Sequence, residues 1–237
     1  MSKQVVLISG ASKGYGKGAA TLLVKDGRYD VVISARDPEH TEAAAEEIGC
    51  DFFVADVTKT EDWSSLREYV INKYGRIDIL VNNAGGGIAV KPLVKQSLEQ
   101  IKQSIDLNLN GCIYGCYTFV QDMINAKSGL IINVTSVCAV KAWPGFSIYS
   151  AGKGGMRMFT KCLQTELQPF NIRCTTFVPA AGRTDFSVSA GLPENPNPVG
   201  IFPEDAGLAI YDIIKMPTHV LVEEYTMWGM DQMVVPM

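Results

Sequence analysis

Residues 148–155 read IYSAGKGG, which places a tyrosine four residues before a lysine. Tyr149 and Lys153 therefore share one face of any helix that contains both. A tyrosine with its ordinary pKa of about 10 transfers protons poorly at neutral pH, but a nearby ammonium favours the phenolate and lowers that pKa. The pair could perform acid–base chemistry at a substrate oxygen. Taken alone, however, this spacing is more often a surface helix pair.

The residues that follow predict the helix this chemistry requires. Met156, Phe159, Leu163 and Leu167 recur at intervals of three and four, so a helix should run on to Pro169. Three glycines in its first turns each cost about 0.5–1 kcal/mol relative to alanine. Either the backbone must approach another segment closely there, or the tyrosine and lysine must stand side by side.

Short apolar runs alternate with helical patterns along the whole chain. The runs are nearly continuous in apolar residues, as expected of strands that helices cover on both faces. We therefore predict a single-domain α/β fold over 1–237, a Rossmann-like doubly wound parallel sheet. The seven predicted strands are residues 4–9, 30–35, 51–55, 77–81, 130–136, 171–178 and 219–224. The predicted helices cover about 15–26, a segment from Pro38, 60–75, 99–126, about 148–168 and 203–214.

Ligands of such sheets bind beyond the carboxyl ends of the strands. At the first of these ends, ISGASKGYGKG places Gly10, Gly14 and Gly16 between a strand and a helix. Glycines allow a tight turn and close approach to a pyrophosphate, which the helix N-terminus attracts. The GxxxGxG spacing departs from the usual GxGxxG, and glycine-rich turns also simply connect elements. The strand before and the helix after favour a nucleotide site.

The second strand end selects the nucleotide. A carboxylate there would accept the ribose 2′-hydroxyl of NAD, whereas an arginine suits the 2′-phosphate of NADP. This chain has Arg36, and Lys13 in the glycine loop could reach the same phosphate. The two cations favour NADP. The alternative is a solvated surface arginine paired with Asp37.

The next three strand ends carry further polar residues. Asp56 could accept from the adenine amino group or act as a helix N-terminal acid, and these roles are compatible. Asn83 and the small residues after it suit a tight turn beside a cofactor, although such residues are common in ordinary loops. Ser136 ends the fifth strand and could hold a substrate oxygen near Tyr149. With a dinucleotide loop upstream, this serine favours the catalytic interpretation of Tyr149 and Lys153.

Taken together, these motifs resemble those of a known family, the short-chain dehydrogenase/reductases. The motifs that carry the resemblance are SGASKGYG (9–16), DV (56–57), NNAG (82–85), NLNG (108–111), the serine of NVTS (136), YSAGK (149–153) and PAAGRT (179–184). The resemblance implies a catalytic tetrad of Asn108, Ser136, Tyr149 and Lys153. The tyrosine would move the hydroxyl proton, and the lysine would lower its pKa and hold the nicotinamide ribose. The serine would orient the carbonyl, and the asparagine would position the lysine through a water.

The resemblance also implies which residues bind NADP(H). They are Gly10, Ser12, Lys13, Gly14, Tyr15, Gly16, Arg36, Asp56, Val57, Asn83, Ala84, Gly85, Tyr149, Lys153, Pro179 and Thr184. The chain departs from the usual family pattern at Ser9, Tyr15, Gly152 and Ala180, where threonine, isoleucine, serine and glycine are common. No departure removes a member of the tetrad.

Substrate residues are harder to assign. PAAGRTDFS and MPTHVLVEE resemble, more loosely, the branch of NADP-dependent 3-hydroxy acid (serine-type) dehydrogenases. Lys141 and Arg183 should border the pocket, where either could pair with an anionic substrate group. Solvated surface cations are an equal alternative. Trp143, Phe146 and Phe186 would supply an apolar wall.

Composition excludes several classes of protein. The 237 residues carry a formal charge of -4, with 47% hydrophobic and 19% charged residues, so no basic footprint for nucleic acid or membranes is visible. No apolar window is long enough for a membrane span, and the start lacks a signal-peptide pattern. Six cysteines without a CxxC pair, and only two histidines, argue against a metal site and for reduced thiols in the cytoplasm. The proline-rich stretch is a loop, and we expect residues of about 184–203 to form a substrate loop.

The sequence therefore predicts an NADP(H)-dependent oxidoreductase that interconverts a carbonyl compound (a ketone or an aldehyde) and an alcohol. A non-catalytic NADP-sensing regulator is the alternative, but such proteins typically lack the tyrosine or the lysine. Use of NAD is a second alternative. The expected partners are a small-molecule substrate and further copies of the chain. Relatives usually pair through two long helices, here about 99–126 and 150–168, which predicts a homodimer or homotetramer.

Overall fold

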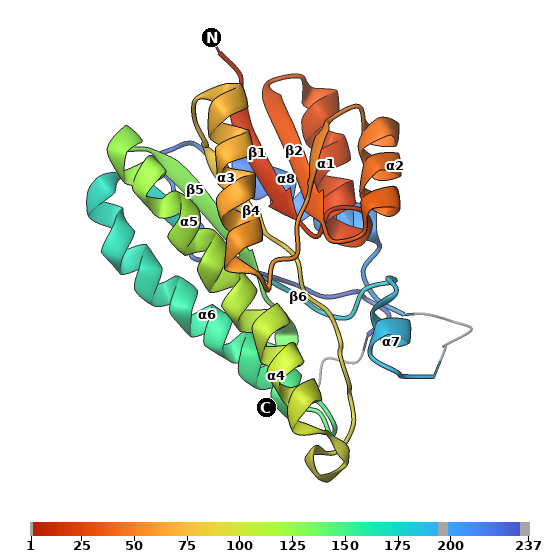
Figure 1. Cartoon of the computed structure of the whole chain (residues 1–237). Coiled ribbons are helices and arrows are strands. Elements are labelled where there is room, and N and C mark those ends of the chain that lie inside the picture. Colours follow the sequence, from red (N-terminus) through yellow and green to blue (C-terminus); the bar gives the residue numbers. More distant parts are fainter. Residues whose placement is uncertain (1, 194–198, 233–237) are drawn as a thin grey trace.

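The computed structural model describes residues 2–193 and 199–232, built around one sheet of seven strands (Figure 1). Neighbouring strands are all parallel, in the order β3-β2-β1-β4-β5-β6-β7. The strands are β1 Gln4–Ser9, β2 Tyr29–Ala35, β3 Asp51–Val54, β4 Ile79–Asn82, β5 Gly129–Val134, β6 Ile172–Pro179 and β7 Glu224–Met227. The predicted doubly wound α/β fold is confirmed.

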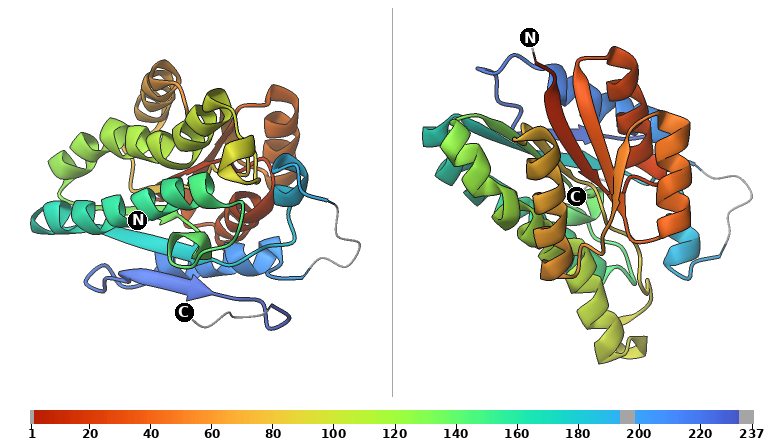
Figure 2. Two further views of the ribbon diagram at one scale, coloured as in Figure 1. Left: turned by 90° about the horizontal axis from the view of Figure 1, so that it is seen from below. Right: turned by 45° about the horizontal axis from the view of Figure 1, so that its top comes forward.

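Helices cover both faces of this sheet (Figure 2). They are α1 Gly14–Asp26, α2 Pro38–Ile48, α3 Thr60–Tyr74, α4 Leu98–Ile105, α5 Gly111–Ala126, α6 Ser147–Leu167, α7 Phe186–Ser189 and α8 Pro203–Lys215. Along β1, Val6 and Ile8 pack with α1, α2 and α8, while Val5 and Leu7 pack with α3, α5 and α6. This alternation explains the continuous apolar runs, because each face of the strand is buried. No helix of the described residues is long and apolar enough to cross a bilayer.

The order of the strands reverses beside β1, and this reversal locates the site. The chain passes from β1 outward to β2 and β3, then returns to place β4 on the other side of β1. At such a reversal the connections leave in opposite directions, so a crevice opens beyond the carboxyl ends of the two strands. The glycine loop after Ser9 and the loop after Asn82 therefore face each other.

Two predicted elements differ from the structure. The helix expected over 99–126 is interrupted by a π-helical turn, η2 (Asp106–Asn110), which the continuous apolar pattern conceals. The last strand, expected over 219–224, begins only at Glu224. The preceding residues turn instead, because the carbonyl of Pro217 accepts from the Val220 N–H, and Arg173 donates to carbonyls of this turn.

Several short elements were not expected. The described residues contain three 3₁₀ turns, η1 (Leu93–Lys95), η3 (Val137–Ala139) and η4 (Gln168–Phe170). The expected substrate loop of about 184–203 contains the short helix α7, and residues 194–198 of it lie outside the described residues. Because α7 has only four residues, no helical periodicity announces it.

Helices α1 and α8 pack backbone against backbone, and this contact anchors the start of α1. A Cβ on Gly207 would lie 2.5 Å from the carbonyl carbon of Gly18, and one on Gly18 would lie 2.8 Å from the Pro203 oxygen. Such distances leave no room for a side chain on either glycine. Since the glycine loop leads directly into α1, this packing also holds the loop in place.

We therefore expect Gly207→Val to destabilise the fold by about 2–3 kcal/mol, because the added side chain overpacks a backbone contact. Chemical denaturation measures this change. The control is Leu208→Ala, one residue along the same helix, where the side chain is 47% exposed and the change should stay within about 0.5 kcal/mol. Equal effects of the two substitutions would contradict the assigned packing.

Candidate active site

The glycine loop is pressed against the end of β4. Gly10 and Gly14 have positive φ angles of 64° and 63°, which favour glycine. A Cβ on Gly10 would lie 2.6 Å from the Cα of Ala84, so the two segments meet through their backbones. The side-chain amide of Asn83 donates to the carbonyls of Ser9 (3.0 Å) and Gly10 (2.8 Å). Asn83 thus shapes the loop that the sequence predicts for a pyrophosphate.

The segment after β6 lies over this loop. Lys13 Nζ is 2.8 Å from the carboxylate of Asp185, and a Cβ on Gly14 would lie 3.8 Å from the Thr184 methyl group. The Tyr15 hydroxyl donates to the carbonyl of Ala180 (3.5 Å), and burial raises the pKa of Tyr15 to about 12. Residues 180–185 therefore lie over the glycine loop, and the Lys13 side chain points toward this segment.

Arg36 stands exposed just beyond the end of β2. The alternative pairing with Asp37 is not formed, because that carboxylate caps α2. Asp37 accepts from the backbone N–H of His40 (3.0 Å) and lies 3.1 Å from His40 Nδ1. These contacts hold the pKa of Asp37 below its usual value. Within the described residues no acidic side chain neutralises Arg36, which fits an arginine that meets a ligand phosphate.

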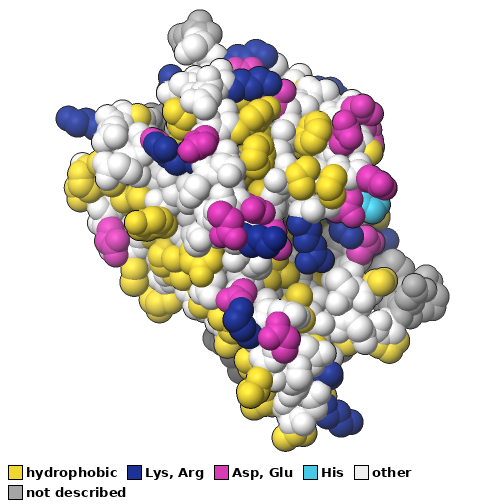
Figure 3. Space-filling model, in the orientation of Figure 1, with side chains coloured by type: hydrophobic (Ala, Val, Ile, Leu, Met, Phe, Trp, Pro, Cys, Tyr) yellow, Lys and Arg dark blue, Asp and Glu magenta, His cyan; other side chains and the backbone are white. Residues whose placement is uncertain are grey.

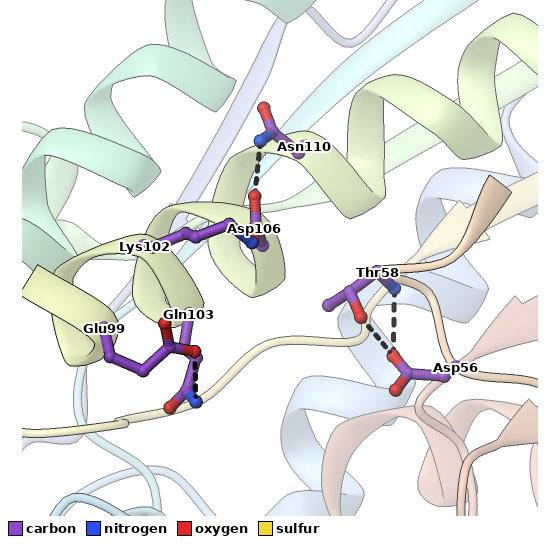
Figure 4. A network of polar contacts seen from close by, with 7 residues as sticks. All are labelled: Asp56, Thr58, Glu99, Lys102, Gln103, Asp106 and Asn110. Atoms are coloured by element: carbon purple, nitrogen blue, oxygen red, sulfur yellow. Dashed lines mark hydrogen bonds and ion pairs between the residues drawn. The ribbon is translucent and has the colours of Figure 1, made fainter.

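Asp56 shapes the turn after β3 (Figure 4). Its Oδ1 accepts from the backbone N–H (3.0 Å) and the hydroxyl (2.8 Å) of Thr58. Asp56 Oδ1 therefore stabilises the turn, whereas Asp56 Oδ2 forms no hydrogen bond within the described residues. The turn role and a ligand contact are therefore compatible, as predicted.

The remaining predicted cofactor residues line the same edge of the sheet. Val57 is buried, and its carbonyl accepts from the Trp63 indole (2.9 Å). Pro179 is the buried last residue of β6, and Ser12 is half-buried within the glycine loop. Together with the open main-chain turn at Gly14, these residues form a cradle that fits a dinucleotide.

Lys153 is a buried cation on the first turns of α6. Its side chain is anchored because Nζ donates to the carbonyl of Val134 at the end of β5 (2.9 Å). Burial lowers the pKa of this ammonium to about 8. A Cβ on Gly85 would lie 2.7 Å from Nζ, so the glycine of the NNAG motif leaves the space the lysine fills.

The Ser136 hydroxyl lies near the Tyr149 hydroxyl and acts to lower the Tyr149 pKa. Ser136 Oγ also accepts from the backbone N–H of Cys138 (3.2 Å), which sets its rotamer. The expected low pKa of Tyr149 is not found. Burial raises it above the ordinary value, since Lys153 Nζ lies 6.0 Å from the ring centroid and is directed at the Val134 carbonyl. The i, i+4 spacing correctly predicts that Tyr149 and Lys153 share one face of the helix. It does not determine where the Lys153 ammonium points.

Asn108 lies fully buried in the π turn η2. Its side-chain amide bonds both ways to the backbone of Gly86, accepting from N–H (3.1 Å) and donating to C=O (2.9 Å). It also donates to the Ser104 carbonyl (3.1 Å). A Cβ on Gly85 would lie 3.1 Å from Asn108 Oδ1, so Asn108 borders the Lys153 site and holds the loop beside it.

The predicted substrate residues fall into two groups. Phe186 on α7 comes close to Tyr149, with ring centroids 5.2 Å apart, and Phe146 lies 6.1 Å from Tyr149. Trp143 packs partly buried against the core on the α8 side of the sheet. Lys141 and Arg183 contact the C-terminal segment: Lys141 Nζ lies 5.5 Å from the Trp228 ring, and Arg183 pairs with Asp231 (2.9 Å).

Two residues at the site escaped the sequence reasoning. Cys138 touches Ser136 and influences Tyr149, and burial raises the pKa of its thiol. Its only sequence signal was its position two residues after Ser136. Asp185 holds Lys13 over the glycine loop, and nothing in the sequence relates two charges so far apart along the chain.

Comparisons with known proteins agree with this geometry. The family model for short chain dehydrogenases matches residues 4–194. An uncharacterized oxidoreductase of Listeria monocytogenes serovar 1/2a is 33% identical over 95% of this chain and 96% of its own length. An NADP-dependent 3-hydroxy acid dehydrogenase of Shigella flexneri is 29% identical over 96% of each.

Among solved structures, the closed form of a serine dehydrogenase complexed with NADP+ superposes with a TM-score of 0.92. It is 26% identical and covers 99% of this chain and 98% of its own. The resemblance of the sequence to the 3-hydroxy acid and serine dehydrogenases is therefore confirmed. On the extent of the family match, its seven-stranded sheet and these relatives, the chain belongs to the short chain dehydrogenase family of oxidoreductases.

Proposed function

We propose that this protein uses NADP(H) to interconvert a ketone or aldehyde and the corresponding alcohol. The observation that carries the proposal is the grouping of Ser136, Tyr149 and the buried Lys153 at the edge where the glycine loop opens. NADP(H), when bound, supplies or accepts the hydride. The chain's own residues bind the substrate oxygen and move its proton.

Each hydroxyl has a role that follows from its surroundings. Ser136 donates to the substrate oxygen and holds it beside Tyr149 Oη. Because burial raises the pKa of Tyr149, the phenol keeps its proton at neutral pH and can donate it to an oxygen that gains negative charge. The Lys153 ammonium, 6.0 Å from the Tyr149 ring centroid, is the cation that would favour the phenolate that remains.

Two phenyl rings lie beside the proposed proton donor. Phe146 and Phe186 lie against the Tyr149 ring, and apolar walls strengthen electrostatic interactions between the groups they enclose. Asn108 does not need to contact Lys153. Its hydrogen bonds to the Gly86 backbone hold the loop after β4 in place, and this loop leaves room beside Gly85 for the Lys153 ammonium. We propose this positioning as the contribution of Asn108 to the tetrad.

Arg36 and Lys13 support NADP(H) over NAD(H). The guanidinium of Arg36 is exposed at the strand end expected to meet the ribose, and the carboxylate of the neighbouring Asp37 is engaged by His40. Lys13 lies in the adjoining loop, and its exposed ion pair with Asp185 is worth little enough to exchange for a phosphate. The serine dehydrogenase of similar structure carries NADP+.

A homodimer or homotetramer remains our expectation for the assembly. Tyr117 on α5 is 82% exposed and Met158 on α6 is 59% exposed. Figure 3 shows hydrophobic side chains gathered over this side of the molecule. The two long helices expected to pair therefore present apolar side chains. A cytoplasmic location also remains a prediction.

The first test is Tyr149→Phe, which keeps the ring and removes the proton donor. We expect kcat for NADPH-dependent carbonyl reduction to fall about 100- to 10,000-fold. NADPH binding, measured by fluorescence, should persist. Tyr69→Phe on α3 is the matched control and should retain activity. If an NADPH-dependent function survives Tyr149→Phe unchanged, the regulator alternative gains and the proposed catalysis is wrong.

The second test is Arg36→Ala. Loss of the charge-assisted hydrogen bonds should raise the Kd for NADPH about 10- to 100-fold and leave the Kd for NADH nearly unchanged. Arg28→Ala at the opposite end of β2 is the control, because it removes an equal charge far from the nucleotide. Equal weakening of NADPH and NADH by Arg36→Ala would argue against 2′-phosphate recognition.

A further inference from the structure

The side chains that contact Tyr149 are mainly aromatic. Phe146, Tyr149 and Phe186 form an aromatic cluster, named here for these three rings. Phe146 and Phe186 are nearly parallel, at 7° with centroids 6.5 Å apart, and both meet Tyr149 at steep angles. Two phenyl rings thus border the proton donor, and each offers an apolar surface to whatever substituent the carbonyl carbon carries.

The polar atoms beside this cluster are uncharged or already bonded. Ser136 contributes a hydroxyl, and burial keeps the Cys138 thiol protonated by raising its pKa. The Lys153 ammonium is bonded to the Val134 carbonyl behind the tyrosine. These groups can bind one carbonyl or hydroxyl oxygen. They offer no cation that would pair with a carboxylate on the substrate.

The cations that could have bound a carboxylate are held elsewhere. Arg183 pairs with Asp231 (2.9 Å), donates to the Gly200 carbonyl (3.3 Å) and lies 4.2 Å from the Phe202 ring centroid. Lys141 Nζ lies over the ring of Trp228. Each therefore has a partner in the C-terminal segment, Trp228 for Lys141 and Asp231 for Arg183.

The element that carries Phe186 is fixed in this position. The Val90 N–H donates to the carbonyl of Ala190 (3.1 Å), and a Cβ on Gly87 would overlap Ala190. Phe186 N–H donates to the Thr184 hydroxyl (3.4 Å), and neighbouring Asp185 pairs with Lys13. Contacts at both ends of α7 thus hold the phenyl ring over Tyr149.

We propose that the substrate is a neutral ketone or secondary alcohol with an apolar substituent that packs on Phe146 and Phe186. This inference rests on the proposed function. The proposed substrate is neutral and therefore differs from the anionic 3-hydroxy acids for which one relative of this chain is named. An unpaired carboxylate beside these rings would lose its hydration without compensation, whereas an apolar group gains from the same burial.

The experiment compares matched neutral and anionic ketones. The probes are ethyl acetoacetate against acetoacetate, and the methyl ester of 4-oxocyclohexanecarboxylate against the free acid, each with NADPH. We expect kcat/KM to favour the ester of each pair by about 100-fold or more. Preference for the acids would overturn the inference and leave the proposed function intact. Failure of every ketone would overturn both.

Variants test the cause of the preference. Phe186→Arg places a cation beside Tyr149 and should shift the ester-to-acid ratio toward the acid at least about 10-fold. Phe170→Arg, at the opposite end of the sheet after α6, is the matched control and should leave the ratio unchanged. An unchanged ratio in Phe186→Arg would contradict the assigned position of the cluster.

Alanine substitutions of single cations test whether any of them binds a substrate carboxylate. We expect Arg183→Ala and Lys141→Ala to keep the ester-to-acid ratio of the wild type. The same holds for Lys91→Ala, since the backbone of Lys91 lies beside Gly145, the residue next to Phe146. A fall in acid turnover alone, in any of the three, would show a carboxylate partner and overturn the inference.

Discussion

The buried ammonium of Lys153 is the constraint on which the site depends. A charge taken out of water is costly unless hydrogen bonds replace its hydration, and here the Val134 carbonyl supplies one. Space for the side chain exists only because Gly85 has no Cβ. That loop keeps its course because the Asn108 amide bonds to Gly86. Mutually dependent contacts from β5, the loop after β4, η2 and α6 thus hold one charge beside Tyr149.

A second constraint joins the two halves of the sheet. Ser9 Oγ accepts from the N–H groups of Asn83 and Ala84 (3.2 Å each), and the Asn83 amide returns to the glycine loop. These bonds cross between β1 and β4, where the strand order reverses. The serine that replaces the family's usual threonine keeps this hydroxyl. The glycine loop after β1 and the loop after β4 are therefore one hydrogen-bonded unit.

Much of this arrangement could be predicted from the sequence, because its signals are local. Continuous apolar runs indicated buried parallel strands, and glycines after the first strand indicated the nucleotide loop. What escaped prediction depends on distant contacts. The Arg173 contacts that delay β7 and the Arg183–Asp231 pair join residues more than 40 positions apart. The π turn at Asn108 was concealed because the apolar pattern continues through it.

The short helix α7 lies between the glycine loop and Tyr149. Its N-terminal neighbour Asp185 pairs with Lys13 of the nucleotide loop, and Phe186 follows directly and faces Tyr149. A 2′-phosphate that attracts Lys13 would compete with Asp185 for the same ammonium. Because the pair is exposed, its loss costs little, while Ala190 still anchors the other end of α7. Loss of the Lys13–Asp185 pair would therefore leave α7 held by the Ala190 contact and by the bond from Phe186 N–H to Thr184, so that Phe186 keeps its place beside Tyr149.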